Sequence, residues 1–379
     1  MVIARRKFHG TIFYDLSKAY NGYTLFAPLG EKDVILIDMH GRVVHKWQME
    51  NPPALHGELL PNGHLLYAGH KADGPLADFF GAGGELVEVD WDGNILWRYE
   101  DPYLHHTFFR LYNDNTLVLK WVEVPKDIAS KVKGGIPGTE KNGVMWCDCL
   151  QEVHPSGKVV WEWKAYEHLD PEKDFICPLC FRDQWTMANS IDVLANGDIL
   201  ICFSRINTLA IIEKETGNIK WKWGSGELSH PDAAVMLTPQ LPAGEIWERG
   251  VERRVRMGDI LFLDKGIHVK NLPLGASRVV ELNPKTNQID WTYLENPITD
   301  FYAPRMGNCQ RLPNGDTLVN EGDFGRIFEL NPNKEIVWEY VSPYYHTFPF
   351  YGRNNYIFRA YRYGPFYKGL QGVKLEPIE

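Results

Sequence analysis

Twelve turn signals of two alternating kinds constrain the fold of this 379-residue chain more than any other feature. The first kind is a turn followed by a run with apolar or aromatic residues at every second position. It occurs six times: GRVVHKW from Gly41, GNILWRY from Gly93, GKVVWEW from Gly157, GNIKWKW from Gly217, NQIDWTY from Asn287 and KEIVWEY from Lys334. The second kind joins two strand-like runs and lies at Asn62-Gly63, Asn113-Asp114, Asn196-Gly197, Met257-Gly258, Asn314-Gly315 and Arg353-Asn354.

Each pair of turns predicts four antiparallel strands, named A to D in chain order. Asn-Gly and Asp-Gly supply the positive backbone angles of tight hairpins, and Val, Ile, Trp and Tyr with period two suit a half-buried sheet. Six pairs predict about 24 strands, and no helical periodicity exceeds a turn or two. We therefore predict an all-β fold, a six-bladed β-propeller in a single domain over residues 1–379. Insertions are expected at about residues 122–147, 164–186 and 238–257.

The phase of the repeat predicts that both termini close the last blade. The chain begins with a C and a D strand, at about 34–38 and 42–47, and ends with an A and a B strand, at about 346–350 and 356–362. Residues 22–28 also resemble a strand and compete for a place in this blade. Five tryptophans share one D-strand position and are predicted to pack between blades: Trp97, Trp161, Trp221, Trp291 and Trp338.

Charge and hydropathy exclude several partners. The net charge of −9 and the pI near 5.8 give no basic surface for a phosphate backbone, so we expect no nucleic-acid partner. No stretch of about 18 apolar residues occurs, and no signal-peptide core follows the first basic residues. We expect a soluble, cytoplasmic protein with no membrane partner. The sequence makes no prediction about its oligomeric state.

The central channel is the expected ligand site. Strand direction places the insertions at 122–147 and 164–186 on one face of the disc, which we take as the ligand entrance because function concentrates on such loops. The A strands are innermost, so residues at their entrance-face ends are expected to face the channel. These residues are His56, His105, His106, Met187, Asn189, His230, Asp232, Asn308, Cys309 and His346.

Histidine serves near neutral pH as a nucleophile, a general base or a metal ligand, although any one of these histidines could equally be structural. Arg205 and Arg359, at the ends of B strands, have a guanidinium fork that suits sulfate, phosphate or carboxylate. The alternative is an ordinary salt bridge for each. Together these residues predict a pocket for a small anion.

The cysteines form two short motifs near the entrance face, Cys147-x-Cys149 and Cys177-x-x-Cys180. Four thiolates could hold a structural zinc that ties two long loops together. The alternative is buried thiols, because Cys147 and Cys149 share one face of a strand. No other cofactor is expected.

Several segments resemble the arylsulfotransferase family, in particular its shorter branch without a signal peptide. They are HGELLPNGHLLYAG from His56, HHTFFRL from His105, WTMANSIDVLANGDILICFSR from Trp185, QRLPNGDTLVNEGDFGRIFEL from Gln310 and FRAYRY from Phe358. The resemblance runs from about Gly22 to Tyr363. It implies a six-bladed propeller that moves a sulfuryl group from a phenol ester to another phenol through a sulfohistidine intermediate.

Position by position, the resemblance implies a catalytic role for His106 or its neighbour His105, for Arg205 and for the fourth-blade nucleophile, which we expect to be His230. We add His346, a further histidine expected in the channel, to the catalytic set. Expected substrate contacts are His56, His105, Met187, Asn189, Asp232, Asn308 and Arg359. Two positions depart from the family pattern. Met187 replaces a histidine, and in the fourth blade either His230 keeps the nucleophile's role or Asp232 stands at the nucleophile's place.

We therefore expect an aryl sulfotransferase-like enzyme for a small aromatic or anionic substrate. Two alternatives stay open: a lyase or hydrolase that uses the same histidines, and a propeller that binds a ligand without catalysis.

Overall fold

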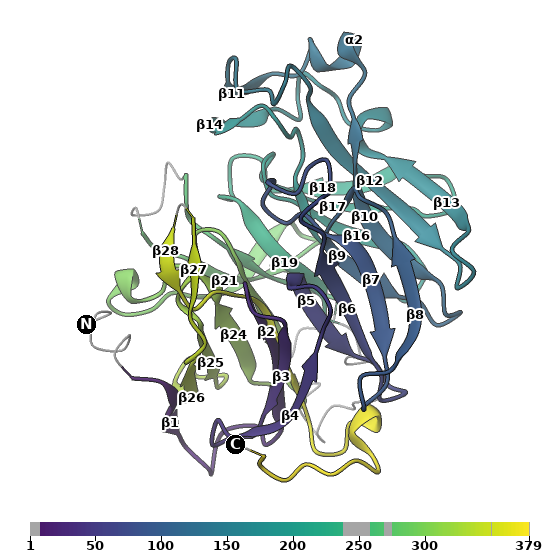
Figure 1. Cartoon of the computed structure of the whole chain (residues 1–379). Helices are drawn as coiled ribbons and strands as arrows, with labels where there is room; N and C mark the ends of the chain where they lie inside the picture. The colour runs from purple at the N-terminus through teal and green to yellow at the C-terminus, as the bar shows by residue number, and fades with distance from the viewer. Residues whose placement is uncertain (1–7, 238–257, 269–274, 350, 379) are drawn as a thin grey trace.

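The computed structural model describes residues 8–237, 258–268, 275–349 and 351–378, and in them the chain forms a six-bladed β-propeller (Figure 1). Each blade is an antiparallel sheet of four strands that follow one another from the channel outward. Blade 1 comprises β5 (Pro53–Leu59), β6 (Leu65–His70), β7 (Gly84–Val89) and β8 (Ile95–Glu100). Blade 2 comprises β9 (Leu104–Arg110), β10 (Thr116–Glu123), β12 (Trp146–Val153) and β13 (Val159–Lys164). Blade 3 comprises β15 (Ala188–Val193), β16 (Ile199–Phe203), β17 (Thr208–Ile212) and β18 (Ile219–Trp223).

The second half of the ring repeats this pattern. Blade 4 comprises β19 (Pro231–Met236), β20 (Ile260–Asp264), β21 (Arg278–Asn283) and β22 (Gln288–Tyr293). Blade 5 comprises β23 (Gly307–Arg311), β24 (Thr317–Glu321), β25 (Arg326–Leu330) and β26 (Ile336–Val341). Blade 6 comprises β29 (Ile357–Tyr363), β2 (Tyr23–Pro28), β3 (Asp33–Ile37) and β4 (Val43–Gln48). Blade 5 gains a fifth, outer strand, β1 (Gly10–Tyr14). The inner strands contact one another in a closed ring, from β29 through β5, β9, β15, β19 and β23.

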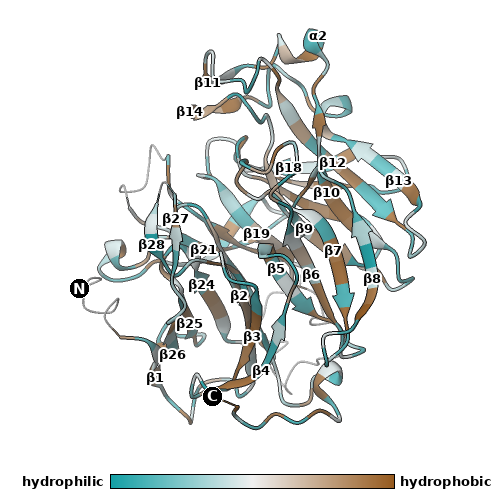
Figure 2. Cartoon of the chain, in the orientation of Figure 1, coloured by the Kyte–Doolittle hydropathy of each residue, from teal (hydrophilic) through white to brown (hydrophobic). Residues whose placement is uncertain are grey.

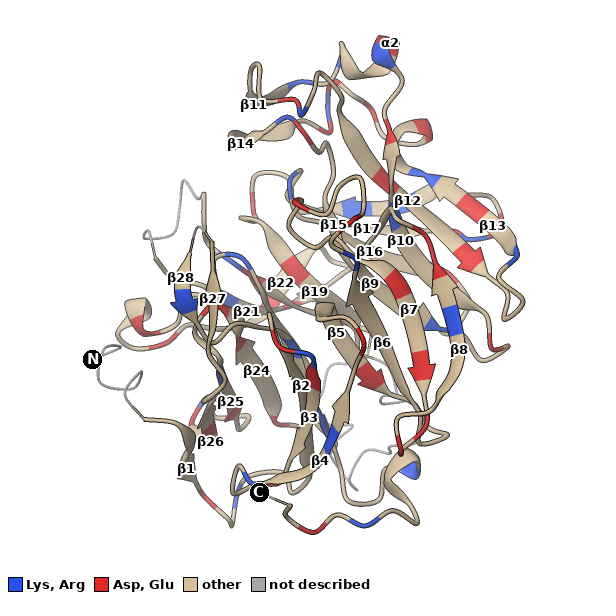
Figure 3. Ribbon diagram, viewed as in Figure 1, with Lys and Arg blue, Asp and Glu red and all other residues tan. Residues whose placement is uncertain are grey.

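The core is divided among the blades. A separate cluster of buried apolar residues fills each of the six interfaces between neighbouring blades. Figure 2 shows apolar and polar residues alternating along many of the strands, as period-two patterning requires. Figure 3 shows acidic and basic residues interspersed over the blades. No helix in the described part of the chain is long and apolar enough to cross a membrane.

The repeated tryptophans contact the next blade, as predicted. The indole of Trp97 donates to the carbonyl of Pro155 in blade 2, and that of Trp338 donates to Met39 in blade 6. The indole of Trp221 donates to Asn287 Oδ1 in blade 4. Trp161 and Trp291 lie against cationic side chains of the following blade, Lys214 and Arg311.

Both termini close the last blade, but the division of strands differs from the prediction. The C-terminal segment supplies only the inner strand β29, and the N-terminal segment supplies β2, β3 and β4. The strand-like residues 22–28 therefore take the B position, and 356–362 contain the A strand rather than the B strand. Residues 346–348 form β27 (His346–Phe348), which pairs with β28 (Gly352–Asn354) in a separate hairpin outside the blades.

The first two insertions meet on one face, as predicted. They carry α2 (Lys126–Ala129), β11 (Gly134–Ile136) and β14 (Ile176–Phe181), and β11 pairs with β14 in a two-stranded parallel sheet (Figure 1). We call residues 124–145 and 165–186 the cap. A side chain at Gly134 would lie 2.0 Å from the carbonyl oxygen of Ile176, so glycine is required at this crossing. The third insertion, at 238–257, lies outside the described residues.

Candidate functional site

In the described part of the chain, buried polar atoms without a hydrogen bond lie at the inner strands of five blades and on the second strand of blade 5. Within the described residues, each of the following atoms is buried and makes no hydrogen bond: His56 Nδ1, His106 Nε2, Asn189 Oδ1, Asp232 Oδ2, Asn320 Oδ1 and Arg359 Nε. They belong in order to blades 1, 2, 3, 4, 5 and 6. Buried polar groups in proteins are nearly always paired, so the unpaired atoms at the inner strands are candidates for ligand contacts, although other buried atoms of the described residues are also unpaired.

The backbone at three of these inner strands shares an unusual conformation. His106, Met187 and His230 have φ values of 53°, 50° and 59°, in the left-handed region that residues other than glycine seldom adopt. The pairing of each inner strand with its neighbour shifts in register close to this point. Such strain persists where the surrounding structure enforces it, and it is common at functional sites. The three positions are structurally equivalent, as the repeat predicts.

A chain of ring nitrogens connects a carboxylate to His106. Asp148 Oδ1, on β12, lies 3.3 Å from His105 Nε2, and His105 Nδ1 lies 3.0 Å from His106 Nδ1. Burial raises the pKa of Asp148 to about 6, against the opposing effect of hydrogen bonds from Thr186 and Ala188. Burial lowers the pKa of His105 to about 3 and holds that of His106 well below 6.5. Both imidazoles are therefore neutral at pH 7.

The charge of Asp148 determines which ring nitrogens of His105 and His106 carry protons. The 3.3 Å approach of Asp148 Oδ1 to His105 Nε2 is an ion-pair contact without a hydrogen bond, and an ionised Asp148 favours the proton of His105 on Nε2. With that tautomer, His105 Nδ1 is the acceptor and takes the proton of His106 Nδ1. His106 Nε2 then carries a lone pair and no proton. This is the arrangement in which a carboxylate orients one imidazole and, through it, a second.

Apolar and cationic groups surround the free nitrogen of His106. The rings of Phe80 and Phe358 lie 6.2 and 6.3 Å from the imidazole, centre to centre. After burial and the neighbouring His105, the positive charges of Lys265 and Arg359 also lower the pKa of His106, so their field reaches this ring.

The loop between β6 and β7 fits closely over His106. Gly81 accepts a backbone hydrogen bond from His106, and a side chain at Gly81 would lie 2.3 Å from His106 Cε1. The position of the imidazole therefore depends on glycine at 81.

Two cations and one carboxylate bridge the inner strands. Arg359 Nη2 lies 2.6 Å from the carbonyl oxygen of Asn189 and 3.3 Å from Asp232 Oδ1. Lys265 Nζ lies 3.7 Å from Asp232 Oδ2. Two cations against one carboxylate leave one net positive charge in a buried site, which favours an anionic ligand.

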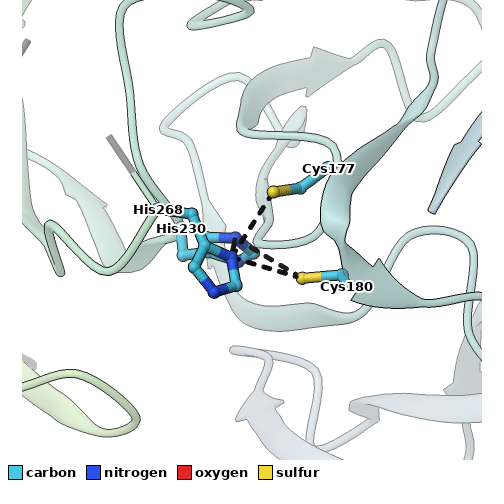
Figure 4. Close-up of side chains that lie close together, drawn as sticks. All are labelled: Cys177, Cys180, His230 and His268. Carbon is cyan, nitrogen blue, oxygen red and sulfur yellow. Dashed lines mark hydrogen bonds between the residues drawn. The ribbon is translucent and has the colours of Figure 1, made fainter. Parts of the chain in front are cut away.

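A second cluster lies where the cap meets blade 4. Cys177 and Cys180 of β14 face His230 and His268, and the nearest ligating atoms of all four lie within 4.8 Å of one another (Figure 4). His230 Nε2 is 3.1 Å from His268 Nδ1 and 3.6 Å from Cys180 Sγ. Cys177 Sγ is 3.4 Å from His268 Nδ1.

The structure divides the four cysteines that the sequence grouped. Cys177 and Cys180 join the cluster just described, whereas Cys147 and Cys149 are buried within blade 2 and lie outside it. Their sulfurs contact the backbone carbonyls of Asp148 and Leu150. The four-thiolate site predicted from the sequence is therefore not formed, and Cys147 and Cys149 are buried thiols, the alternative that the sequence left open.

Several predicted residues lie away from the axis or already have partners. His346 lies in the β27–β28 hairpin, not at the end of an inner strand, and its side chain is 42% exposed. Arg205 donates to the carbonyls of Phe181 and Gln184 and pairs with Asp183, so it anchors the cap.

Two more predicted residues have structural contacts. The amide of Asn308 exchanges two hydrogen bonds with the backbone of Ala360 and links blade 5 to blade 6. Cys309 is buried in the core between blades 4 and 5. His56 is on the axis, stacked on Phe108, and Arg359 is on the inner strand β29 rather than on a B strand.

Sequence reasoning missed Gly81, Asp148, Lys265 and His268. Asp148 lies between two cysteines of one strand, and a carboxylate in such an apolar run was a usable signal. Lys265 and His268 directly follow strand B of blade 4, which ends at the entrance face. The loops after the B strands therefore carry site residues, as the inner strands do.

Comparison with known proteins identifies related sequences and folds. The chain matches the family model for arylsulfotransferase (ASST) over residues 30–340. No curated protein matches. A protein of unknown function from Bacteroides caccae is 14% identical, with a TM-score of 0.53 over 90% of this chain and 98% of that chain, which shows a shared fold. Virginiamycin B lyase from Staphylococcus aureus, a catalytically inactive variant with quinupristin, is 11% identical, with a TM-score of 0.46 over 88% of each chain.

Proposed function

Because the chain belongs to the arylsulfotransferase family, we propose that it transfers a sulfuryl group between phenolic molecules, with His106 as the nucleophile. The observation that carries this assignment is the unpaired, buried Nε2 of His106 at the end of the Asp148–His105–His106 chain. The sequence assigned the nucleophile to His230, but the ring nitrogen of His230 faces His268 and Cys180. His106 is the better candidate.

The reaction would proceed in two displacements at sulfur. The lone pair of His106 Nε2 attacks the sulfur of the donor ester, an N–S bond forms, and the S–O bond to the first phenol breaks. Positive charge that develops on His106 is stabilised through His105 by the carboxylate of Asp148. The oxygen of an acceptor phenol then attacks the same sulfur, an O–S bond forms and the N–S bond breaks, which frees the imidazole. The proton of the acceptor hydroxyl is taken up by the released phenolate, so the exchange balances.

The surroundings of His106 suit an aryl sulfate. Lys265 and Arg359 supply positive charge for the sulfuryl oxygens, and such electrostatic stabilisation is commonly the largest contribution to catalysis. Phe80 and Phe358 supply ring faces for the aromatic part.

Turnover of p-nitrophenyl sulfate in the presence of phenol tests the proposal. We expect nitrophenol release that depends on phenol, a loss of at least about 10³-fold in His106→Gln, and little change in His154→Ala, a histidine in an exposed turn. Quenched samples should carry one SO₃ group on the peptide that contains His106.

Two outcomes would contradict the assignment. An SO₃ group on the His230 peptide would restore the nucleophile that the sequence predicted. Saturable binding of aryl sulfates without release of nitrophenol would favour the non-catalytic alternative.

A further inference from the structure

We propose that Cys177, Cys180, His230 and His268 bind a zinc ion that fastens the cap to blade 4. The ligands come from three separate segments: β14 of the cap, the residue directly before β19, and the loop after β20. Neither the family match nor the sequence prediction of a four-cysteine site includes this set. The proposal does not depend on the transferase activity.

The distances within the cluster fit a tetrahedral ion. Zinc binds sulfur at about 2.3 Å and nitrogen at about 2.0–2.1 Å, so adjacent ligand atoms of a Cys₂His₂ tetrahedron lie about 3.3–3.8 Å apart. The observed separations are 3.1 Å between the two imidazole nitrogens and 3.4, 3.6 and 3.8 Å between sulfur and nitrogen. All four ligating atoms lie within 4.8 Å of one another and face one another, so small side-chain movements would complete the tetrahedron (Figure 4).

The chemistry of the donors selects zinc over the hard cations. Two thiolates and two neutral imidazoles form one of the standard structural zinc sets, whereas Mg²⁺ and Ca²⁺ require oxygen ligands. The two thiolates neutralise the charge of the ion. Four protein ligands also leave no open coordination position, which indicates a structural rather than a catalytic ion.

Backbone contacts hold the ligands in place. The amide of His230 donates to Asn207 Oδ1 at 2.8 Å, and the amide of His268 donates to Ser229 Oγ at 2.9 Å. The amide of Cys177 donates to the carbonyl of Arg205 at 2.8 Å. These bonds orient the ligand backbone from outside the cluster, as the outer shell of a metal site does.

The ion would have two consequences. It would connect the cap, through β14, to the blade that supplies Asp232 and Lys265 to the axis. It would also occupy His230 Nε2, so His230 could not act as the nucleophile.

Metal content of the purified full-length chain is the first test. We expect about one zinc per chain by elemental mass spectrometry, and Co²⁺ exchanged into the site should give the intense visible bands of a tetrahedral ion together with thiolate charge-transfer bands. Wild-type protein that contains no zinc and gives no such spectrum with Co²⁺ would overturn the proposal. These readouts are independent of sulfuryl transfer.

Matched variants locate the site. Cys180→Ala and His268→Ala should each lose the ion or bind it at least tenfold more weakly, while Cys149→Ala and His154→Ala should retain it. Zinc retained at full stoichiometry in Cys180→Ala would place the metal elsewhere. A mass loss of two hydrogens on the peptide that contains Cys177 and Cys180, with no metal, would identify a disulfide instead.

Discussion

Arg359 Nη2, on the inner strand of blade 6, lies 3.3 Å from Asp232 Oδ1, on the inner strand of blade 4, and both side chains are at least 96% buried. Blade 5 separates these strands around the ring, so the ion pair spans part of the channel. With Lys265 on the other carboxylate oxygen, the group keeps a net positive charge next to His106. This charge is the basis of the expected preference for sulfate esters.

Replacing Arg359 with Met should weaken the use of aryl sulfates. A hydrogen bond to a charged group contributes about 1.5–3 kcal/mol, so we expect kcat/KM for p-nitrophenyl sulfate to fall about 10- to 150-fold. Arg353→Met is the control, because Arg353 lies on the exposed hairpin strand β28. Equal values for wild type and Arg359→Met would show that this guanidinium does not contact the substrate.

Activity should fall as the pH drops below about 6. Burial raises the pKa of Asp148 to about 6, so the ionised form that orients His105 is lost below that pH. A protonated Asp148 would donate to His105 Nε2. The proton of His105 would then be on Nδ1 and would be donated to His106 Nδ1, so the proton of His106 would be on Nε2.

The pH profile of Asp148→Asn tests this chain directly. The amide donates to His105 in the same way, so we expect a loss of about 10²- to 10⁴-fold at neutral pH and no acid limb near pH 6. An unchanged acid limb in Asp148→Asn would assign it to another group.

Gly81→Ala should disturb His106 without unfolding the protein. The added methyl group would lie 2.3 Å from His106 Cε1, and the φ value of 88° adds backbone strain. Gly93→Ala is a matched control, because Gly93 has a φ of 86° and nothing within 4 Å of an added Cβ. Both variants should lose about 1 kcal/mol of folding free energy from strain. Only Gly81→Ala should also lose at least about tenfold in kcat; similar activities in the two variants would contradict this.

Closure of the ring should depend on Arg362. Its guanidinium, fully buried on β29, pairs at 2.6 Å with Glu329 of blade 5 and donates to Thr24 of β2. Arg362→Met leaves a buried carboxylate unpaired, which should lower the free energy of unfolding by about 3–5 kcal/mol in urea titrations.

Two further variants show whether the stability loss in Arg362→Met comes from the ion pair. Adding Glu329→Gln to Arg362→Met should recover part of the loss. Lys374→Met, from the exposed Lys374–Glu376 pair, should change stability by less than about 1 kcal/mol. A loss in Arg362→Met no larger than in Lys374→Met would show that the ion pair does not stabilise closure.

The sequence predicted the ring because its signals are local. Each hairpin needs only its own turn residues and a period-two run, and six copies specify six blades whatever their neighbours are. The predicted tryptophan contacts with the next blade follow from the same repeat. The strands that close the ring were harder to predict from the sequence. Residues 22–28 and 356–362 are both strand-like, and only the pairing of β2 with β29 assigns β2 to the B position.

The sequence by itself determined the blade count, the inner strands and the histidines on them, since these follow from the period and direction of successive strands. Only the tertiary structure decided which polar groups meet. Asp148 reaches His105 from the third strand of its blade, His268 reaches Cys177 from a segment 91 residues away, and His346 leaves the axis with its hairpin. Such contacts depend on the distances between atoms of different blades, which the spacing of residues along one chain does not encode.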